Sequence, residues 1–226
     1  MINKIDNKIS FNGKSTILKN LKQVKKAYMS EFYDIKKPAA YQSLPVEKQQ
    51  ELAAEIKEAN MLLRVIREFN KTAFEEGGNY EVFRRLIGFM KTFKIGNCAE
   101  IAEAGKTICK MNGIKNCDIF TLHARTKSGD TRALDHTIVA FKIPKSKNNI
   151  NTKNNKTLLE PYPETRILDL YLDGYMGTAK QAKKVYSCFG LKPDETLLFR
   201  PERTFEPTKE TLENLKKEFP KLVIKK

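Results

Sequence analysis

Apolar residues recur at three- and four-residue intervals through the first part of the chain, which is the spacing of a helix with one buried face. The pattern predicts helices at about 15–33, 46–75 and 80–91. Lys36-Lys37-Pro38 ends the first helix, because proline cannot continue it, and Gly77-Gly78-Asn79 separates the second from the third. Residues 1–14 are polar with scattered isoleucines, so we expect this end of the chain to be frayed.

After residue 92 the pattern changes to short β-branched and aromatic runs, which favour strands. A helix that begins near Cys98 ends at Met111-Asn112-Gly113. The runs predict strands at Cys117–Ala124, Leu134–Phe141, Arg166–Tyr171 and Glu195–Arg200, with helices at Thr178–Phe189 and Thr208–Phe219. A turn at Lys127-Ser128-Gly129-Asp130 makes the first two strands antiparallel neighbours. The sequence therefore predicts an α+β protein in which a helical extension, residues 1–92, packs on a core, residues 93–226.

One stretch of the core has a biased composition. Lys145 to Lys156 consists largely of lysine and asparagine, which is typical of a polar surface loop. We interpret it as an inert insertion. The alternative is a basic flap beside a functional site that helps to select an acidic partner.

The composition describes a folded, non-membrane protein. The chain has 226 residues, of which 40% are hydrophobic and 31% are charged, and this balance is typical of a globular domain. No apolar stretch approaches the roughly 18 residues that a membrane-spanning helix needs. The first residues lack the apolar segment of a cleaved signal peptide, so the sequence displays no secretion route.

The net charge of +15 is the strongest compositional signal. Such a charge permits binding to nucleic acid, to anionic lipid or to an acidic protein. Lysines dominate and are spread along the chain, and no nucleic-acid motif accompanies them. We therefore favour a solvated lysine surface over a dedicated polyanion site, and we do not expect nucleic acid as a partner.

The cysteines and histidines do not form a metal-binding pattern. The chain has four cysteines and two histidines, with no CxxC pair of the kind that structural zinc sites use. We expect neither a metal nor a cofactor. A disulfide framework is also not expected for a chain of this size, so we assume a reducing compartment, in which Cys109 packs in the core.

Cys98 stands where a helix begins. Gly96-Asn97 forms a turn, and Asn97 suits the cap position, where its side-chain oxygen accepts a hydrogen bond from a first-turn N–H. The unpaired N–H groups and the helix dipole at that end stabilise an anion, and the thiolate is the nucleophilic form of cysteine. The plain alternative is a small buried cysteine on an ordinary helix.

Two further residues give Cys98 the partners of a nucleophile. His136 lies at the start of the strand Leu134–Phe141, and Asp169 lies within the apolar run Arg166–Tyr171. An unpaired carboxylate is costly to bury, so Asp169 needs solvent or a cationic or N–H partner. A cysteine, a histidine and an aspartate on such elements can form a set of nucleophile, base and orienting group. His123 is a rival for the base, but it alternates with apolar residues, and we prefer His136.

The order Cys98, His136, Asp169, with small residues after the cysteine, resembles the papain-fold superfamily. The closest resemblance is to its transglutaminase-like branch, which includes Cys-His-Asp toxins and injected effectors of pathogenic bacteria. The resemblance covers about residues 90–175. Two positions differ from the family pattern: Ile138 stands where an aromatic often follows the histidine, and Leu170-Tyr171 stands where proline and an aromatic follow the aspartate.

The resemblance implies a papain- or transglutaminase-like core, in which the nucleophile helix packs on an antiparallel sheet. It implies acyl transfer through a thioester on protein glutamine side chains, by cross-linking or deamidation. The substrate would be a host protein, possibly with an acidic surface, modified in the host cytoplasm by a secreted effector. A regulatory or inhibitory protein over the active-site cleft would be a further partner. Two alternatives stay open, a papain-like protease and a non-enzymatic basic binding protein.

Overall fold

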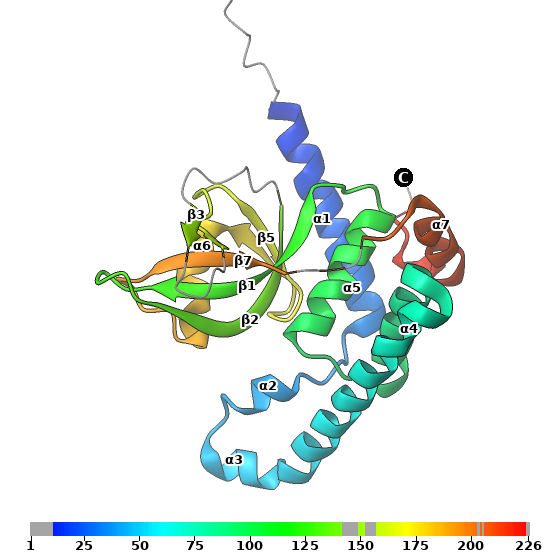
Figure 1. Cartoon of the computed structure of the whole chain (residues 1–226), viewed down its shortest axis with the longest axis horizontal. Helices are drawn as coiled ribbons and strands as arrows, with labels where there is room; N and C mark the ends of the chain where they lie inside the picture. Colours follow the sequence, from blue (N-terminus) through cyan, green and yellow to red (C-terminus); the bar gives the residue numbers. More distant parts are fainter. Residues whose placement is uncertain (1–10, 142–148, 152–156, 203, 205, 225–226) are drawn as a thin grey trace, which may run out of the picture.

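Strands from the second half of the chain form one antiparallel sheet, and helices from both halves pack beside it (Figure 1). This computed structural model describes residues 11–141, 149–151, 157–202, 204 and 206–224. The α+β class expected from the sequence is confirmed.

The sheet has seven strands within the described ranges, in the order β3-β4-β7-β1-β2-β5-β6. Their bounds are β1 Cys117–Arg125, β2 Thr131–Phe141, β3 Asn149–Asn151, β4 Thr157–Leu159, β5 Arg166–Asp169, β6 Tyr175–Thr178 and β7 Thr196–Pro201. β1 and β2 are antiparallel neighbours, as the turn between them predicted. β3, β4 and β6 were not predicted, because they span only three or four residues each and are too short to show a clear alternation.

The stretch interpreted as a loop is partly a strand. Asn149–Asn151 forms β3, which pairs with β4, so the loop prediction is wrong there. The cause is backbone pairing with a neighbouring strand, which a Lys/Asn-rich composition does not reveal. Residues 145–148 and 152–156 lie outside the described residues. The choice between an inert insertion and a basic flap therefore also lies outside what the structure describes.

The α-helices are α1 Phe11–Phe32, α2 Pro38–Tyr41, α3 Val46–Glu51, α4 Ala53–Phe93, α5 Cys98–Met111, α6 Ala179–Val185 and α7 Lys209–Glu218. Two short 3₁₀ turns, η1 Tyr186–Phe189 and η2 Pro220–Leu222, follow α6 and α7. The expected fraying is wrong for residues 11–14, which begin α1. Residues 1–10 lie outside the described part of the chain.

α4 consists of two helices joined by a glycine pair. Gly77 and Gly78 leave the helical conformation, and Gly78 has φ 60° and ψ −153°, a region open almost only to glycine. The rings of Phe69 and Phe89, on opposite sides of the break, have centroids 5.6 Å apart. The two halves therefore lie side by side, and the helix stop predicted at Gly77-Gly78-Asn79 is confirmed.

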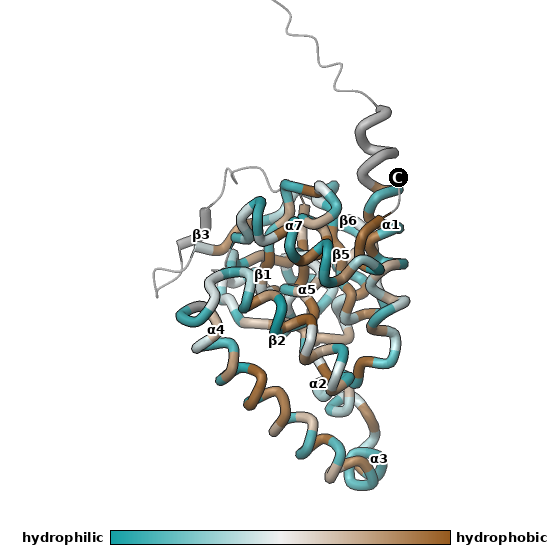
Figure 2. Tube along the Cα trace, turned by 90° about the vertical axis from the view of Figure 1, so that its right-hand side faces the viewer, coloured by the Kyte–Doolittle hydropathy of each residue, from teal (hydrophilic) through white to brown (hydrophobic). Residues whose placement is uncertain are grey.

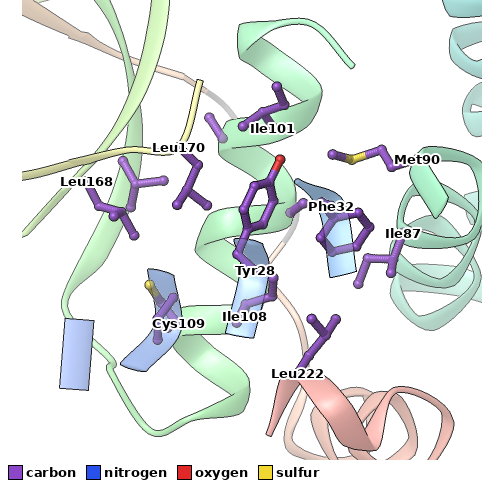
Figure 3. Close-up of a cluster of buried hydrophobic side chains, with 14 of the residues drawn as sticks. Tyr28, Phe32, Ile87, Met90, Ile101, Ile108, Cys109, Leu168, Leu170 and Leu222 are labelled. Atoms are coloured by element: carbon purple, nitrogen blue, oxygen red, sulfur yellow. The ribbon is translucent and has the colours of Figure 1, made fainter. Parts of the chain in front are cut away.

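α5 lies between the sheet and the other large helices (Figure 1). One core cluster joins residues of α1, α4, α5 and α7 to one face of the sheet. Figure 3 shows part of this cluster, with Tyr28 of α1 toward Ile108 of α5, and Phe32 of α1 toward Ile87 and Met90 of α4. Cys109 is fully buried in the same cluster, which confirms its expected packing role. The second cluster packs α6 and η1 on the opposite face of the sheet.

Small residues allow α5 to lie close to the sheet. A Cβ added at Gly105 would lie 2.8 Å from Cδ1 of Leu170, just beyond the end of β5. Real Cβ atoms do not approach a neighbour so closely, so with a larger residue at this position the Leu170 side chain or α5 would have to shift. Gly105 thus allows the nucleophile helix to lie close to the segment that follows Asp169.

The first half of α4 is covered on one side only. Ala59, Leu63 and Ile66 are buried in a small cluster of their own, whereas Met61 and Phe69 are 59% and 51% exposed. Figure 2 shows this half as an arm with hydrophobic positions along its length, reaching away from the sheet. The apolar face predicted for this helix is therefore only partly buried.

Candidate active site

Cys98 is the first residue of α5, and its position is fixed by a reciprocal cap. Asn97 is the N-cap residue, and its side chain accepts the Cys98 N–H, at 2.8 Å to Oδ1, and also the Glu100 N–H. The Asn97 N–H donates in turn to Glu100 Oε2 at 3.2 Å. This is a capping box, and it sets the sulfur in the first helical turn, as the sequence predicted.

The helical extension contributes a cation to this end of α5. Arg67, from the first half of α4, donates from Nε to Glu100 Oε1 at 2.7 Å. The bond to Glu100 raises the pKa of Arg67, burial opposes the shift, and the charges of Glu100 and Cys98 add to it. Arg67 therefore lies within electrostatic reach of the sulfur. The sequence gives no sign of the Arg67–Glu100 pair. The role of Glu100 in the cap was also missed, although the spacing Asn97-x-x-Glu100 is a recognisable signal of a capping box.

His136 lies in an irregular part of β2. Thr121 pairs with Thr137 and His123 with Ala133, so one residue of β1 faces three residues of β2. Within this bulge Asp135 has φ 49°, in the left-handed region. Bulges bend a strand and re-aim its side chains, and this one places His136 beside the end of β5.

Asp169 is the last residue of β5 and is the partner of His136. The distance from its Oδ2 to His136 Nε2 is 2.7 Å, and both side chains are 1% exposed. Its other oxygen accepts the Leu172 N–H at 3.2 Å. The buried carboxylate thus has the N–H and imidazole partners that the sequence analysis required.

The second ring nitrogen of His136 is left for the thiol. Nδ1 is buried and has no partner at hydrogen-bond distance in the described part of the chain. Cys98 nevertheless interacts with the ring and, because Nε2 is bonded to Asp169, Nδ1 is the nitrogen left for the sulfur. Such a bond is often long until a substrate binds. The structure therefore brings Cys98, His136 and Asp169 together in the expected order.

The environment of His136 favours the imidazolium. Burial lowers its pKa, but the hydrogen bond with Asp169, the interaction with Cys98 and the charges of both groups outweigh burial and raise the pKa to about 9. At neutral pH the ring is thus protonated beside the sulfur. A thiolate next to an imidazolium is an activated nucleophile.

Aromatic rings enclose the imidazole. Phe189 of η1 stacks on it, with centroids 3.9 Å apart and planes 11° apart. The rings of Tyr171 and Tyr186 lie at 5.4 Å and 5.7 Å from it. The sequence analysis assigned no role to these residues, since they come from segments that only the tertiary fold brings to His136. They hold the ring in place and keep water from it.

The rival histidine lies elsewhere in the sheet. His123 belongs to β1, where it is opposite Leu198 of β7 and Ala133 of β2. The carboxylate of Asp169 bonds His136. The geometry therefore supports His136 as the imidazole of the set.

Within the described ranges, no group of three or more His, Cys, Asp or Glu side chains could hold a metal ion. The four cysteines are free thiols. Among the helices that the structure describes, none has the length and apolarity to cross a membrane. No family model, curated protein or solved structure matches this chain.

Proposed function

We propose that the protein is a cysteine acyltransferase that acts on glutamine side chains of proteins, as a transglutaminase or a glutamine deamidase. One observation carries the proposal. A buried imidazole is bonded through Nε2 to Asp169, has its Nδ1 unpaired among the described residues, and interacts with Cys98 at a helix N-terminus. This is the arrangement of a nucleophile, a general base and acid, and an orienting carboxylate.

The proposed reaction proceeds through a thioester. Cys98 attacks the carboxamide carbon, and His136 donates its proton to the leaving ammonia. Water or an amine then attacks the thioester while His136 takes up a proton. Water yields glutamate, and a lysine amine yields a cross-link. Asp169 holds the imidazole in the orientation that serves both steps and stabilises its charged form.

The burial of the site supports a side-chain substrate over a backbone substrate. Cys98 is 9% exposed and His136 and Asp169 are 1% exposed. A glutamine side chain is slender and can reach a recessed sulfur, whereas a peptide bond within a polypeptide needs an open groove. The resemblance to transglutaminase-like enzymes supports the same choice. A host protein with an acidic surface as the substrate, modified by a secreted effector, remains part of the proposal.

The test is peptide mapping by mass spectrometry after incubation with a lysate. Lysates of eukaryotic and bacterial cells are treated with the wild-type protein, with Cys98→Ala and with Cys188→Ala. We expect deamidated glutamines, or glutamine–lysine cross-links that have lost ammonia. These products should be absent with Cys98→Ala and present with Cys188→Ala, which removes another thiol from the same protein.

Each outcome decides between the proposed activities. New chain termini in place of modified glutamines would show a protease. A modification that persists with Cys98→Ala, or the absence of any modification in every lysate, would contradict an acyltransferase that uses Cys98.

A further inference from the structure

Acyl transfer needs hydrogen-bond donors for the oxygen that becomes negative when the sulfur attacks. Removing one such donor from an enzyme costs about 10²–10³-fold in rate. The expected donor is the Cys98 N–H, but it already donates to Asn97 Oδ1 at 2.8 Å. It can serve a substrate only if Asn97 turns away. The site therefore needs a donor from another part of the chain.

The hydroxyls of Tyr171, Tyr175 and Tyr186 are buried near the site. That of Tyr186 interacts with the Asp169 carboxylate, whereas those of Tyr171 and Tyr175 donate to no acceptor among the residues that the structure describes. A buried polar group without a partner is costly. Such a group therefore indicates a ligand that supplies the missing hydrogen bond. The three hydroxyls differ in which charged groups of the site act on them.

Of the three, only the Tyr171 hydroxyl interacts electrostatically with Cys98. Its pKa is raised by burial first, then by the charge of Cys98 and after that by Asp169. For Tyr175 and Tyr186 the contribution that follows burial is the charge of Asp169, and Cys98 does not act on them. A raised pKa keeps the Tyr171 phenol neutral, and therefore a donor, at physiological pH. The backbone N–H of Ala40 approaches the same oxygen, which leaves the hydroxyl proton available.

The ring of Tyr171 is held on two sides. Its centroid lies 5.4 Å from that of His136, with an angle of 62° between the planes. Lys37 Nζ lies 5.5 Å from the ring centroid and 2.9 Å from Asp173 Oδ1. Tyr171 is only 5% exposed. The hydroxyl is thus a donor fixed in advance, as stabilisation of a transition state requires.

We propose that the Tyr171 hydroxyl donates a hydrogen bond to the substrate's carbonyl oxygen when Cys98 attacks the carbonyl carbon. The oxygen becomes negative as that carbon becomes tetrahedral, and it is the acceptor that the buried hydroxyl otherwise lacks. This assignment rests on the proposed acyltransferase function. It names a catalytic residue that the Cys-His-Asp pattern does not contain.

The experiment compares two reactions of the same sulfur. p-Nitrophenyl acetate transfers its acetyl group to a thiolate through a tetrahedral oxyanion and releases p-nitrophenolate. Iodoacetamide alkylates the thiolate by displacing iodide, and no oxyanion forms. Both rates are measured at Cys98, by the p-nitrophenolate burst and by peptide mass, in wild type and in Tyr171→Phe. Tyr175→Phe is the matched control, since it removes a buried hydroxyl whose pKa is raised by Asp169 and not by Cys98.

We expect Tyr171→Phe to slow acetylation of Cys98 by about 10²-fold and to leave its alkylation within about twofold of wild type, whereas Tyr175→Phe should acetylate like wild type. Because the Ala40 N–H that approaches the hydroxyl also donates to the Lys37 carbonyl oxygen at 2.8 Å, loss of the hydroxyl leaves no buried donor without an acceptor, and Tyr171→Phe should unfold at the same temperature as wild type or higher. A lower unfolding temperature would mean that the hydroxyl is bonded within the fold, and it would overturn the assignment. So would unchanged acetylation, or an equal loss in both reactions. If wild-type Cys98 is alkylated but never acetylated, the proposed function itself fails.

Discussion

A buried histidine is normally neutral at neutral pH, because burial penalises its charged form. His136 differs because Asp169 bonds Nε2 at 2.7 Å, and this bond and Cys98 together raise its pKa to about 9 against the effect of burial. The ring can thus release its proton to a leaving group in one step and take up a proton in the next. The chemistry of the site depends on this one ring more than on any other side chain.

Substitutions at the site should separate the base from the group that orients it. His136→Ala should abolish turnover. Asp169→Asn should retain a small fraction of the activity, with a loss of up to about 10⁴-fold, as in a serine-protease triad. Because Asp169 raises the pKa of His136, the alkaline limb of the pH–rate profile should move from about pH 9 to lower pH in Asp169→Asn. Wild-type rates should fall as the pH rises through that value, where the imidazolium is lost.

The assay uses a glutamine-containing protein with a fluorescent amine, and the fold of each variant is checked by circular dichroism. His123→Ala is the control and should be close to wild type. If His123→Ala abolished the reaction and His136→Ala spared it, the assignment of the base would be wrong.

The bulge in β2 is the element that aims His136. Asp135, at φ 49°, has a conformation that glycine adopts freely and that asparagine and aspartate tolerate, whereas a β-branched residue there is strained by about 1–2 kcal/mol or more. Asp135→Gly should therefore keep both stability and activity. Asp135→Val should lower the free energy of unfolding by about that amount and reduce activity further, since the strain straightens the strand and turns the ring away.

Urea unfolding and the amine-incorporation assay measure the two effects. The side chain of Asp135 is exposed, so a loss of packing does not complicate the comparison. Equal behaviour of Asp135→Gly and Asp135→Val would show that the left-handed conformation does not matter for His136.

The sequence predicted the elements of the site better than their details. Apolar periodicity located α5, β1, β2 and β5, and Asn97 marked the start of the nucleophile helix. The bulge was not predictable, since it depends on how β1 and β2 align across the pair and not on the residues of β2 alone. The strands β3, β4 and β6 were missed for a related reason, because pairing with neighbours defines such short segments.

Contacts between segments far apart in the chain hold the whole molecule together, and these contacts could not be predicted from the sequence either. Arg67 reaches Glu100 from the helical extension, and Lys37, before α2, bonds Asp173 beyond β5. The core cluster likewise joins α1 and α4 to α5 and the sheet. The extension therefore takes part in building the end of α5 that carries Cys98.

The central claim is that Cys98 and His136 form an activated pair, and competitive alkylation tests it most directly. The folded protein is treated with iodoacetamide at about pH 6, below the range in which ordinary thiols ionise, and the label on each cysteine is followed by mass spectrometry. Cys109 and Cys117 are buried and should be protected. Cys188 is exposed, but burial of its thiol and the charge of Asp169 raise its pKa.

We expect Cys98, although only 9% exposed, to react at least about tenfold faster than Cys188, because the imidazolium beside it stabilises the thiolate. His136→Ala should remove this advantage. A Cys98 rate equal to or below that of Cys188, and unchanged by His136→Ala, would contradict the account.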